Sequence, residues 1–136
     1  LRAGKRVVLI VDNPTLPDPA RCLSRTRLHL PQPLAGWFSA EGPPEACKLS
    51  LTRHLELSEL YRRLLADVQS MDPERISIFD TLPFLCDERL DLCGSAERGQ
   101  VLYSYTDHVS DYAAGKIGGP LNAYLNRPGM GPPVGP

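Results

Sequence analysis

A continuous apolar run near the start of the chain predicts a buried strand. Residues 6–11 read RVVLIV, and the run ends at Asp-Asn-Pro. β-Branched residues without regular polar alternation are typical of a central strand covered on both faces, and Asn-Pro is a turn signal. We therefore predict that residues 6–11 form an interior strand of an α/β sheet.

A helical period follows between Thr52 and Ser70. Apolar side chains recur there at intervals of three and four residues: Leu57, Leu60, Tyr61, Leu64, Leu65 and Val68. This spacing places them on one side of a helix, while Glu59 and Arg63 can pair one turn apart on the outer side.

The segment RISIFD at 75–80 then predicts a second strand. A strand, a helix and a strand in this order favour a parallel sheet.

The other segments are less regular. Seven prolines between residues 14 and 45 exclude long helices and central strands, so a long ordered loop or an insertion is predicted there. Residues 101–103 predict a short extended piece, and a final helix follows, with Ser110 as its N-cap. The Gly-Gly-Pro at 118–120 predicts that this helix is kinked or split, because glycine and proline are the poorest helix formers.

Length and charge narrow the classes of function. A chain of 136 residues suits one domain with a single core. The formal net charge is −1 and the basic residues are scattered, so no nucleic-acid partner is expected. No apolar stretch approaches the roughly 20 residues that span a bilayer. Because the chain begins at Leu1 and enters a strand almost at once, we interpret it as a processed product or a piece of something longer.

Four cysteines, Cys22, Cys47, Cys86 and Cys93, lack the Cys-x-x-Cys spacing that favours zinc or thioredoxin-type chemistry. Two disulfides in an oxidising compartment are the preferred interpretation, and free buried thiols or a metal site are the alternatives. A bond between Cys86 and Cys93 would close a short charged loop. A bond between Cys22 and Cys47 would close the proline-rich excursion.

His108 is the main candidate for chemistry. It lies in VLYSYTDHVSDYAAG, residues 101–115, in a polar turn before the final predicted helix. Imidazole titrates near neutral pH and suits a general base, and open α/β sheets bind ligands at the carboxyl edge of their strands. From the residues alone, a solvated loop histidine beside Asp107 is the competing interpretation. Asp12 and Asn13 could also face this edge, although a turn is the simpler role for them.

The other histidines predict no site. His29 and His54 are too isolated in sequence to define a metal site with His108, and we interpret them as surface histidines. The arginines of the long helix fall mostly on its wet face. Neither a metal nor a cofactor is therefore expected.

Several segments, taken in order, resemble one family. RVVLIVDNPTLP, RCLSR, ISIFDTLPFLC and GQVLYSYTDHVSDYAA follow the order seen in the SGNH-type domain fused to bacterial acyltransferase-3 membrane proteins. The similarity covers most of residues 4–125, and its last segment is the chemically specific one. There Tyr103, His108, Ser110 and Ala113–Ala114 stand on the matching positions of the family pattern Tyr-x-Asp-x-x-His-Leu-Ser and the small residues after it.

The resemblance implies a fold and a domain organisation. The expected fold is an α/β, SGNH hydrolase-like or flavodoxin-like three-layer arrangement, with a parallel sheet flanked by helices and a long proline-rich excursion. Residues 1–125 would be the carboxyl-terminal part of such a domain, and residues 126–136 a proline- and glycine-rich tail. The Gly-Asp-Ser turn that holds the family's serine nucleophile does not occur in this sequence. Periplasmic relatives often pair cysteines at similar places, which favours the two disulfides.

The same resemblance implies a function. His108 would be the catalytic base, with Asp107 as its acidic neighbour, because Tyr105 stands where the family has an aspartate. The chain would be part of an extracytoplasmic O-acyltransferase that transfers an acyl group, expected to be acetyl, to a hydroxyl of a cell-envelope glycan. An upstream transmembrane acyltransferase domain in the same polypeptide would be its partner, at the periplasmic or extracytoplasmic face of the membrane. This chain alone would be inactive. The alternative is a catalytically degenerate SGNH-like binding or interaction domain.

Overall fold

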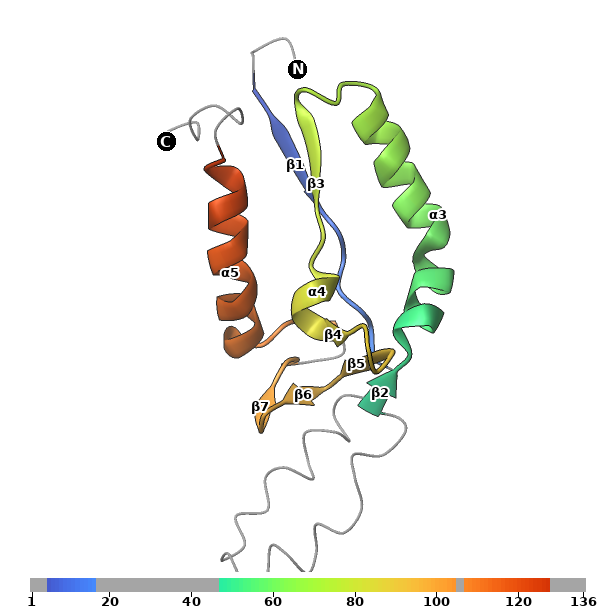
Figure 1. Ribbon diagram of the computed structural model, residues 1–136, viewed down its shortest axis with the longest axis vertical. Coiled ribbons are helices and arrows are strands. Elements are labelled where there is room, and N and C mark those ends of the chain that lie inside the picture. Colours follow the sequence, from blue (N-terminus) through green and yellow to red (C-terminus); the bar gives the residue numbers. More distant parts are fainter. Residues whose placement is uncertain (1–4, 17–46, 105–106, 128–136) are drawn as a thin grey trace, which may run out of the picture.

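The computed structural model describes residues 5–16, 47–104 and 107–127, and these form an α/β arrangement (Figure 1). Strands β1 (Val7–Ile10) and β3 (Ile76–Phe79) pair in parallel, with Val7 opposite Ile76 and Ile10 opposite Phe79. Helix α3 (Leu51–Ser70) precedes β3 in the chain. The predicted strands, the helix and the parallel pairing are confirmed. Within the described residues the parallel sheet has two strands.

Two helices flank the parallel pair. Helix α3 and helix α5 (Asp111–Leu125) lie on opposite sides of β1 and β3 in Figure 1. The Tyr61 hydroxyl of α3 donates to the Ile10 carbonyl at 3.4 Å, and the Tyr124 hydroxyl of α5 donates to the Ile78 carbonyl at 3.0 Å. The Tyr124 ring also meets Phe79 edge to face, at 5.3 Å between centroids. These contacts agree with the expected helices on both sides of a parallel sheet.

Short antiparallel elements lie beyond the carboxyl ends of the parallel strands. Helix α4 (Leu82–Leu85) leads into β4 (Cys86–Asp87), which pairs with β5 (Leu92–Gly94), and β5 pairs with β2 (Lys48–Leu49). The charged segment between Cys86 and Cys93, predicted as a loop, is therefore a small hairpin. A second hairpin joins β6 (Ala96–Glu97) to β7 (Gln100–Val101). Its two turn residues, Arg98 and Gly99, both have positive φ, 50° and 78°, as a type I′ turn requires.

Helix α5 is not split, because it continues through Gly118, Gly119 and Pro120 to Leu125. Contacts at both ends explain this continuity. At the start, Ser110 is the predicted N-cap, and its hydroxyl accepts from the Ala113 amide at 3.2 Å. Near the end, Tyr124 packs on β3. Tertiary packing at both ends therefore overrides the poor helix propensity of the middle.

The main buried cluster joins distant parts of the chain. It consists of Leu16, Leu85, Leu102, Tyr103 and Ala113. It lies where the segment after β1, helix α4 and the start of α5 meet, so the core is next to the carboxyl ends of the parallel strands. That position holds the candidate site against well-packed side chains.

Two expectations about burial are wrong for the described residues. Strand β1 was expected to be covered on both faces, but Val7 is 37% and Ile10 49% exposed, because β1 pairs there with β3 alone. Leu57, Leu60 and Leu64 of α3 were expected to face a core, but each is more than half exposed. The predicted proline-rich excursion falls mainly on residues 17–46, and most of the predicted tail on residues 128–136, outside the described ranges.

Candidate functional site

Polar residues gather where β1 and β3 end. Asp12 and Asn13 follow β1, and Asp80 and Thr81 follow β3. The buried Thr81 hydroxyl donates to the Val11 carbonyl at 3.1 Å, which ties the two strand ends together. Asp80 accepts from the Arg62 guanidinium at 2.7 Å and from the Leu82 amide at 3.0 Å. The carboxyl edge of the parallel pair is therefore a set of mutually bonded polar groups.

His108 lies in a turn that is closed by backbone hydrogen bonds. Tyr103 and Val109 form an isolated antiparallel bridge, and the Ser104 amide donates to the His108 carbonyl at 2.8 Å. The turn leads directly into the N-cap of α5, where the Ser110 hydroxyl donates to the Val101 carbonyl at 2.5 Å. Tyr105, the residue at the family's aspartate position, lies outside the described residues.

Asn13 connects the His108 turn to β1. Its side-chain amide nitrogen Nδ2 donates to the Asp107 carbonyl at 2.8 Å, across 94 positions of sequence. Its backbone amide donates to the Asp12 carboxylate at 3.0 Å. His108 therefore lies next to the carboxyl end of a parallel strand, the edge at which open α/β sheets bind ligands. The sequence interpretation of Asn13 as a simple turn residue missed this contact.

Asp107 and His108 form an acid–imidazole pair. Asp107 Oδ1 is 2.9 Å from His108 Nδ1, so the adjacent carboxylate does reach the ring. In the neutral imidazole, a proton on Nδ1 shared with Asp107 puts the basic lone pair on Nε2. The side chains are 73% exposed for His108 and 57% for Asp107, so solvent screens the attraction between them. This geometry can orient an imidazole as a base, but it supplies less electrostatic stabilisation than a buried carboxylate does.

Comparison with known proteins identifies the family. A search against protein-family models matches residues 1–122 to the SGNH domain that is fused to AT3 domains. The chain belongs to this family. Membership accounts for the α/β class and associates the SGNH domain with acyltransferase function, through an AT3 domain linked in the same polypeptide. Searches of curated proteins and of solved structures return no match.

His54 of the SGNH domain is not the surface histidine that we expected. It is partly buried in the first turns of α3, and its Nε2 is buried without a hydrogen-bond partner among the described residues. Burial lowers the pKa of His54, and the nearby positive charge of Arg62 lowers it further, while Asp80 and Asp12 act in the opposite direction. His54 therefore favours the neutral form. Helical spacing could have indicated its inward position, because His54, Ser58 and Arg62 recur four residues apart.

Tyr103 is a second buried polar group beside this edge. The residue is 1% exposed, and its hydroxyl has no hydrogen-bond partner among the described residues. Burial raises the pKa of Tyr103, and the negative charge of Asp12 adds to that effect. Tyr103 thus stays protonated and contributes to the core beneath the His108 turn.

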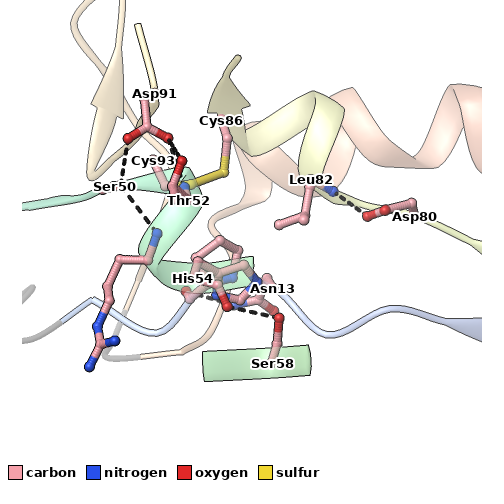
Figure 2. The surroundings of a disulfide bond; sticks show 12 residues. Asn13, Ser50, Thr52, His54, Ser58, Asp80, Leu82, Cys86, Asp91 and Cys93 are labelled. Carbon is pink, nitrogen blue, oxygen red and sulfur yellow. Dashed lines mark hydrogen bonds between the residues drawn. A yellow bond between two sulfur atoms is a disulfide. The ribbon is translucent and has the colours of Figure 1, made fainter. Parts of the chain in front are cut away.

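The disulfide prediction is confirmed for Cys86 and Cys93, whose sulfur atoms are 2.08 Å apart (Figure 2). Cys47 is also disulfide-bonded, whereas Cys22 lies outside the described residues. The Cys86–Cys93 bond joins β4 to β5 next to the start of α3. It thereby closes the β4–β5 hairpin near the helix that carries His54.

Asp91 attaches the disulfide-closed hairpin to α3 (Figure 2). Its carboxylate accepts from the Ser50 hydroxyl at 2.5 Å, from the Thr52 amide at 2.7 Å and from the Thr52 hydroxyl at 2.9 Å. The hydrogen bond from Ser50 is the largest of the causes that lower the pKa of Asp91, followed by those from Thr52. The same Ser50 hydroxyl accepts from the Arg53 amide at 3.2 Å as the N-cap of α3.

The described residues offer no cluster of three or more histidine, cysteine or acidic side chains that could hold a metal ion. None of their helices is long and apolar enough to cross a membrane.

Proposed function

We propose that this SGNH domain contributes the acid–base histidine to an O-acyl transfer reaction. The observation that carries the proposal is the position of the His108 turn, which Asn13 holds at the carboxyl end of β1 while Asp107 faces the Nδ1 atom of His108. A general base needs an oriented ring whose pKa lies near neutral pH, and histidine meets that requirement. Family membership supports acyl transfer as the reaction class.

The proposed reaction uses a serine from outside this chain. Its hydroxyl would lose a proton to Nε2 of His108 while its oxygen adds to the acyl carbonyl carbon, giving a tetrahedral intermediate. Collapse of that intermediate would expel the donor's leaving group, which takes the proton from His108. The acceptor hydroxyl would then give its proton to Nε2, attack the acyl carbon and release the serine, which recovers the proton. No cofactor enters these steps.

We propose an acetyl group as the acyl unit and a hydroxyl of a cell-envelope glycan as the acceptor, at the extracytoplasmic face of the membrane. The disulfide bonds of Cys47 and of Cys86 with Cys93 support that location, because disulfides persist in oxidising compartments. The linked AT3 domain would supply the acyl group from the same polypeptide.

The test uses the full polypeptide that joins the SGNH domain to its AT3 domain, with a small acetyl ester as donor. His108→Ala should lower turnover by roughly 10²- to 10⁴-fold, the usual contribution of a general base. Asp107→Asn should lower turnover less, because the exposed pair is screened. Asp111→Asn is the matched control, since Asp111 is an exposed acid in the next helix. Turnover of His108→Ala within twofold of wild type would refute the proposal.

A glycan-binding domain without activity is the second candidate. The exposure of Asp107 and His108 favours it, because efficient triads bury the acid that orients the histidine. Calorimetric titration of the SGNH domain with an envelope polysaccharide distinguishes the two. Binding that His108→Ala leaves unchanged, in a polypeptide without transfer activity, would support this candidate over catalysis.

A further inference from the structure

Helix α3 carries large apolar side chains on its outward side. Leu57 is 66% exposed, Leu60 79% and Leu64 58%, and Met71, which caps the helix, is 78% exposed. Their spacing of three, four and seven residues places all four along one side of the helix. We call this set the leucine stripe. Single exposed leucines are common, but a row of them along a helix marks a contact surface.

The inward side of α3 is more polar than the leucine stripe. His54, Ser58 and Arg62 are partly buried there, and Arg62 pairs with Asp80 at 2.7 Å. Full burial of a leucine side chain contributes about 1.5–3 kcal/mol. The sequence therefore places three leucines and Met71 where the described residues give them little to pack against.

Charges beside the leucine stripe distinguish between kinds of partner. The neighbouring exposed residues are Arg53, Glu56, Glu59, Arg63 and Asp67, two basic and three acidic. A helix that lies on an anionic membrane surface carries mainly Lys and Arg on its flanks. Mixed charges beside an apolar seam are instead typical of helices that pair with another amphipathic helix.

The size of the leucine stripe favours a covalently linked partner. Four side chains expose on the order of a few hundred Å², whereas a stable interface between separate chains buries roughly 800 Å² on each partner. A segment of the same polypeptide is held at an effective concentration of about millimolar, so it can bind through a smaller surface. The SGNH family supplies such a linkage, because its domains are fused to AT3 domains.

We propose that the leucine stripe packs against an amphipathic helix of the same polypeptide that lies outside these 136 residues. That helix presents leucine-like side chains to Leu57, Leu60 and Leu64, and charges of both signs beside them. The proposal does not depend on acyl transfer, because it concerns the surface opposite the inward side of α3.

Oxidation of Met71 by dilute hydrogen peroxide tests the proposal, with each methionine followed by peptide mass spectrometry. In the full polypeptide, held in nanodiscs, Met71 should oxidise at least tenfold more slowly than in the denatured protein. In the isolated 136-residue chain it should oxidise at nearly the denatured rate. The double variant Leu60→Glu and Leu64→Glu should restore fast oxidation in the full polypeptide. Leu90→Glu is the matched control, since Leu90 is 69% exposed in the β4–β5 hairpin, away from α3's stripe.

Each other result overturns the proposal. Equal oxidation of Met71 in the full polypeptide and in the denatured protein would show that nothing covers the stripe. If Met71 oxidises slowly in the isolated chain at low concentration, the residues that pack on the leucine stripe belong to the 136-residue chain itself. Protection of the isolated chain that rises with its concentration would indicate a second copy, and protection that appears on adding empty nanodiscs would indicate lipid.

Discussion

The side chain of Asn13 joins the turn of the candidate base to the end of β1. It follows β1, whereas the carbonyl that it contacts belongs to Asp107, next to His108. Within the turn, the Ser104 amide donates to the His108 carbonyl, but this local hydrogen bond does not attach the turn to the sheet. At the scale of residues, the candidate site therefore depends on a contact between two segments that are far apart in the chain.

Asn13→Asp should loosen the His108 turn without disturbing the strands. The substitution replaces the donating Nδ2 by an oxygen that repels the Asp107 carbonyl. A hydrogen bond of this kind contributes about 0.5–1.5 kcal/mol, so exchange of the Ser104 amide hydrogen should become roughly two- to tenfold faster, as measured by NMR. Asn126→Asp is the control, because Asn126 also donates through Nδ2 to a carbonyl, that of Asn122, at 2.8 Å. Equal exchange at Ser104 in both variants would contradict the role of Asn13.

Asp91→Asn should reduce the loss of stability in acid. The folded state lowers the pKa of Asp91 below its ordinary value of 3.8, so it favours the charged carboxylate. That stabilisation is complete above the unfolded pKa and is lost as the pH falls through the lower, folded pKa. Urea unfolding from about pH 5 downwards measures the effect. The wild type should lose more stability on acidification than Asp91→Asn, whereas Asp67→Asn, an exposed acid on α3, should follow the wild type.

Polar contacts attach the helices of this protein to its hairpins. Ser50, the N-cap of α3, bonds to the β4–β5 hairpin through Asp91, and Lys116 of α5 pairs with Glu97 of β6. Helix α5 is held near its start and near its end, and its middle contains the Gly-Gly-Pro that sequence propensity disfavours. At the scale of elements, packing at the ends of α5 compensates for weak local preference in its centre.

Gly118→Ala should stabilise the protein by about 0.5–1 kcal/mol, because alanine lowers the entropy cost of the helix interior. Apart from the neighbouring backbone of α5 itself, no atom of the described residues lies within 4 Å of the added methyl carbon, so no clash with another element opposes the gain. Gly99→Ala should instead destabilise by about 1–2 kcal/mol, since Gly99 has a φ of 78° in the β6–β7 turn. Thermal unfolding of the two variants provides the measurement. A lower melting temperature for Gly118→Ala would show that the helix centre is not limited by propensity.

The whole molecule combines a parallel α/β unit with a set of short antiparallel strands. The buried cluster of Leu16, Leu85, Leu102, Tyr103 and Ala113 joins the two, and the Cys86–Cys93 bond closes the β4–β5 hairpin next to it. Strand β1 and the leucine stripe leave apolar side chains exposed. At this scale, the described residues combine the candidate site at His108 with apolar side chains that they leave exposed.

Removal of the Cys86–Cys93 bond should lower the free energy of unfolding by about 2–3 kcal/mol, the entropy term for a loop of this length. The double variant Cys86→Ser and Cys93→Ser, unfolded in urea without reductant, measures this difference. Wild type under reducing conditions provides a comparison in which Cys47 is also released. A double variant as stable as the oxidised wild type would show that the hairpin is held by its other contacts alone.

Predictions from the sequence succeeded where the signal is local. The helical period found α3, the apolar runs found β1 and β3, and Ser110 was identified as an N-cap from its place before a helix. Predictions were wrong about which side chains are buried and about whether α5 is interrupted, because both properties depend on contacts with distant segments. The exposure of Leu60 and the unbroken course of α5 through Pro120 could not be predicted, because helical spacing does not specify what covers a face or holds an end.

By itself, the sequence determined β1, β3, α3 and the start of α5, the preferred pairing of Cys86 with Cys93, and the family pattern around His108, because each is encoded by residues close together in the chain. Only the tertiary structure decided that Asn13 reaches Asp107, that His54 turns inward beside Arg62, and that the leucine stripe faces outward. These outcomes follow from how distant segments pack, and local periodicity carries no information about which segments meet.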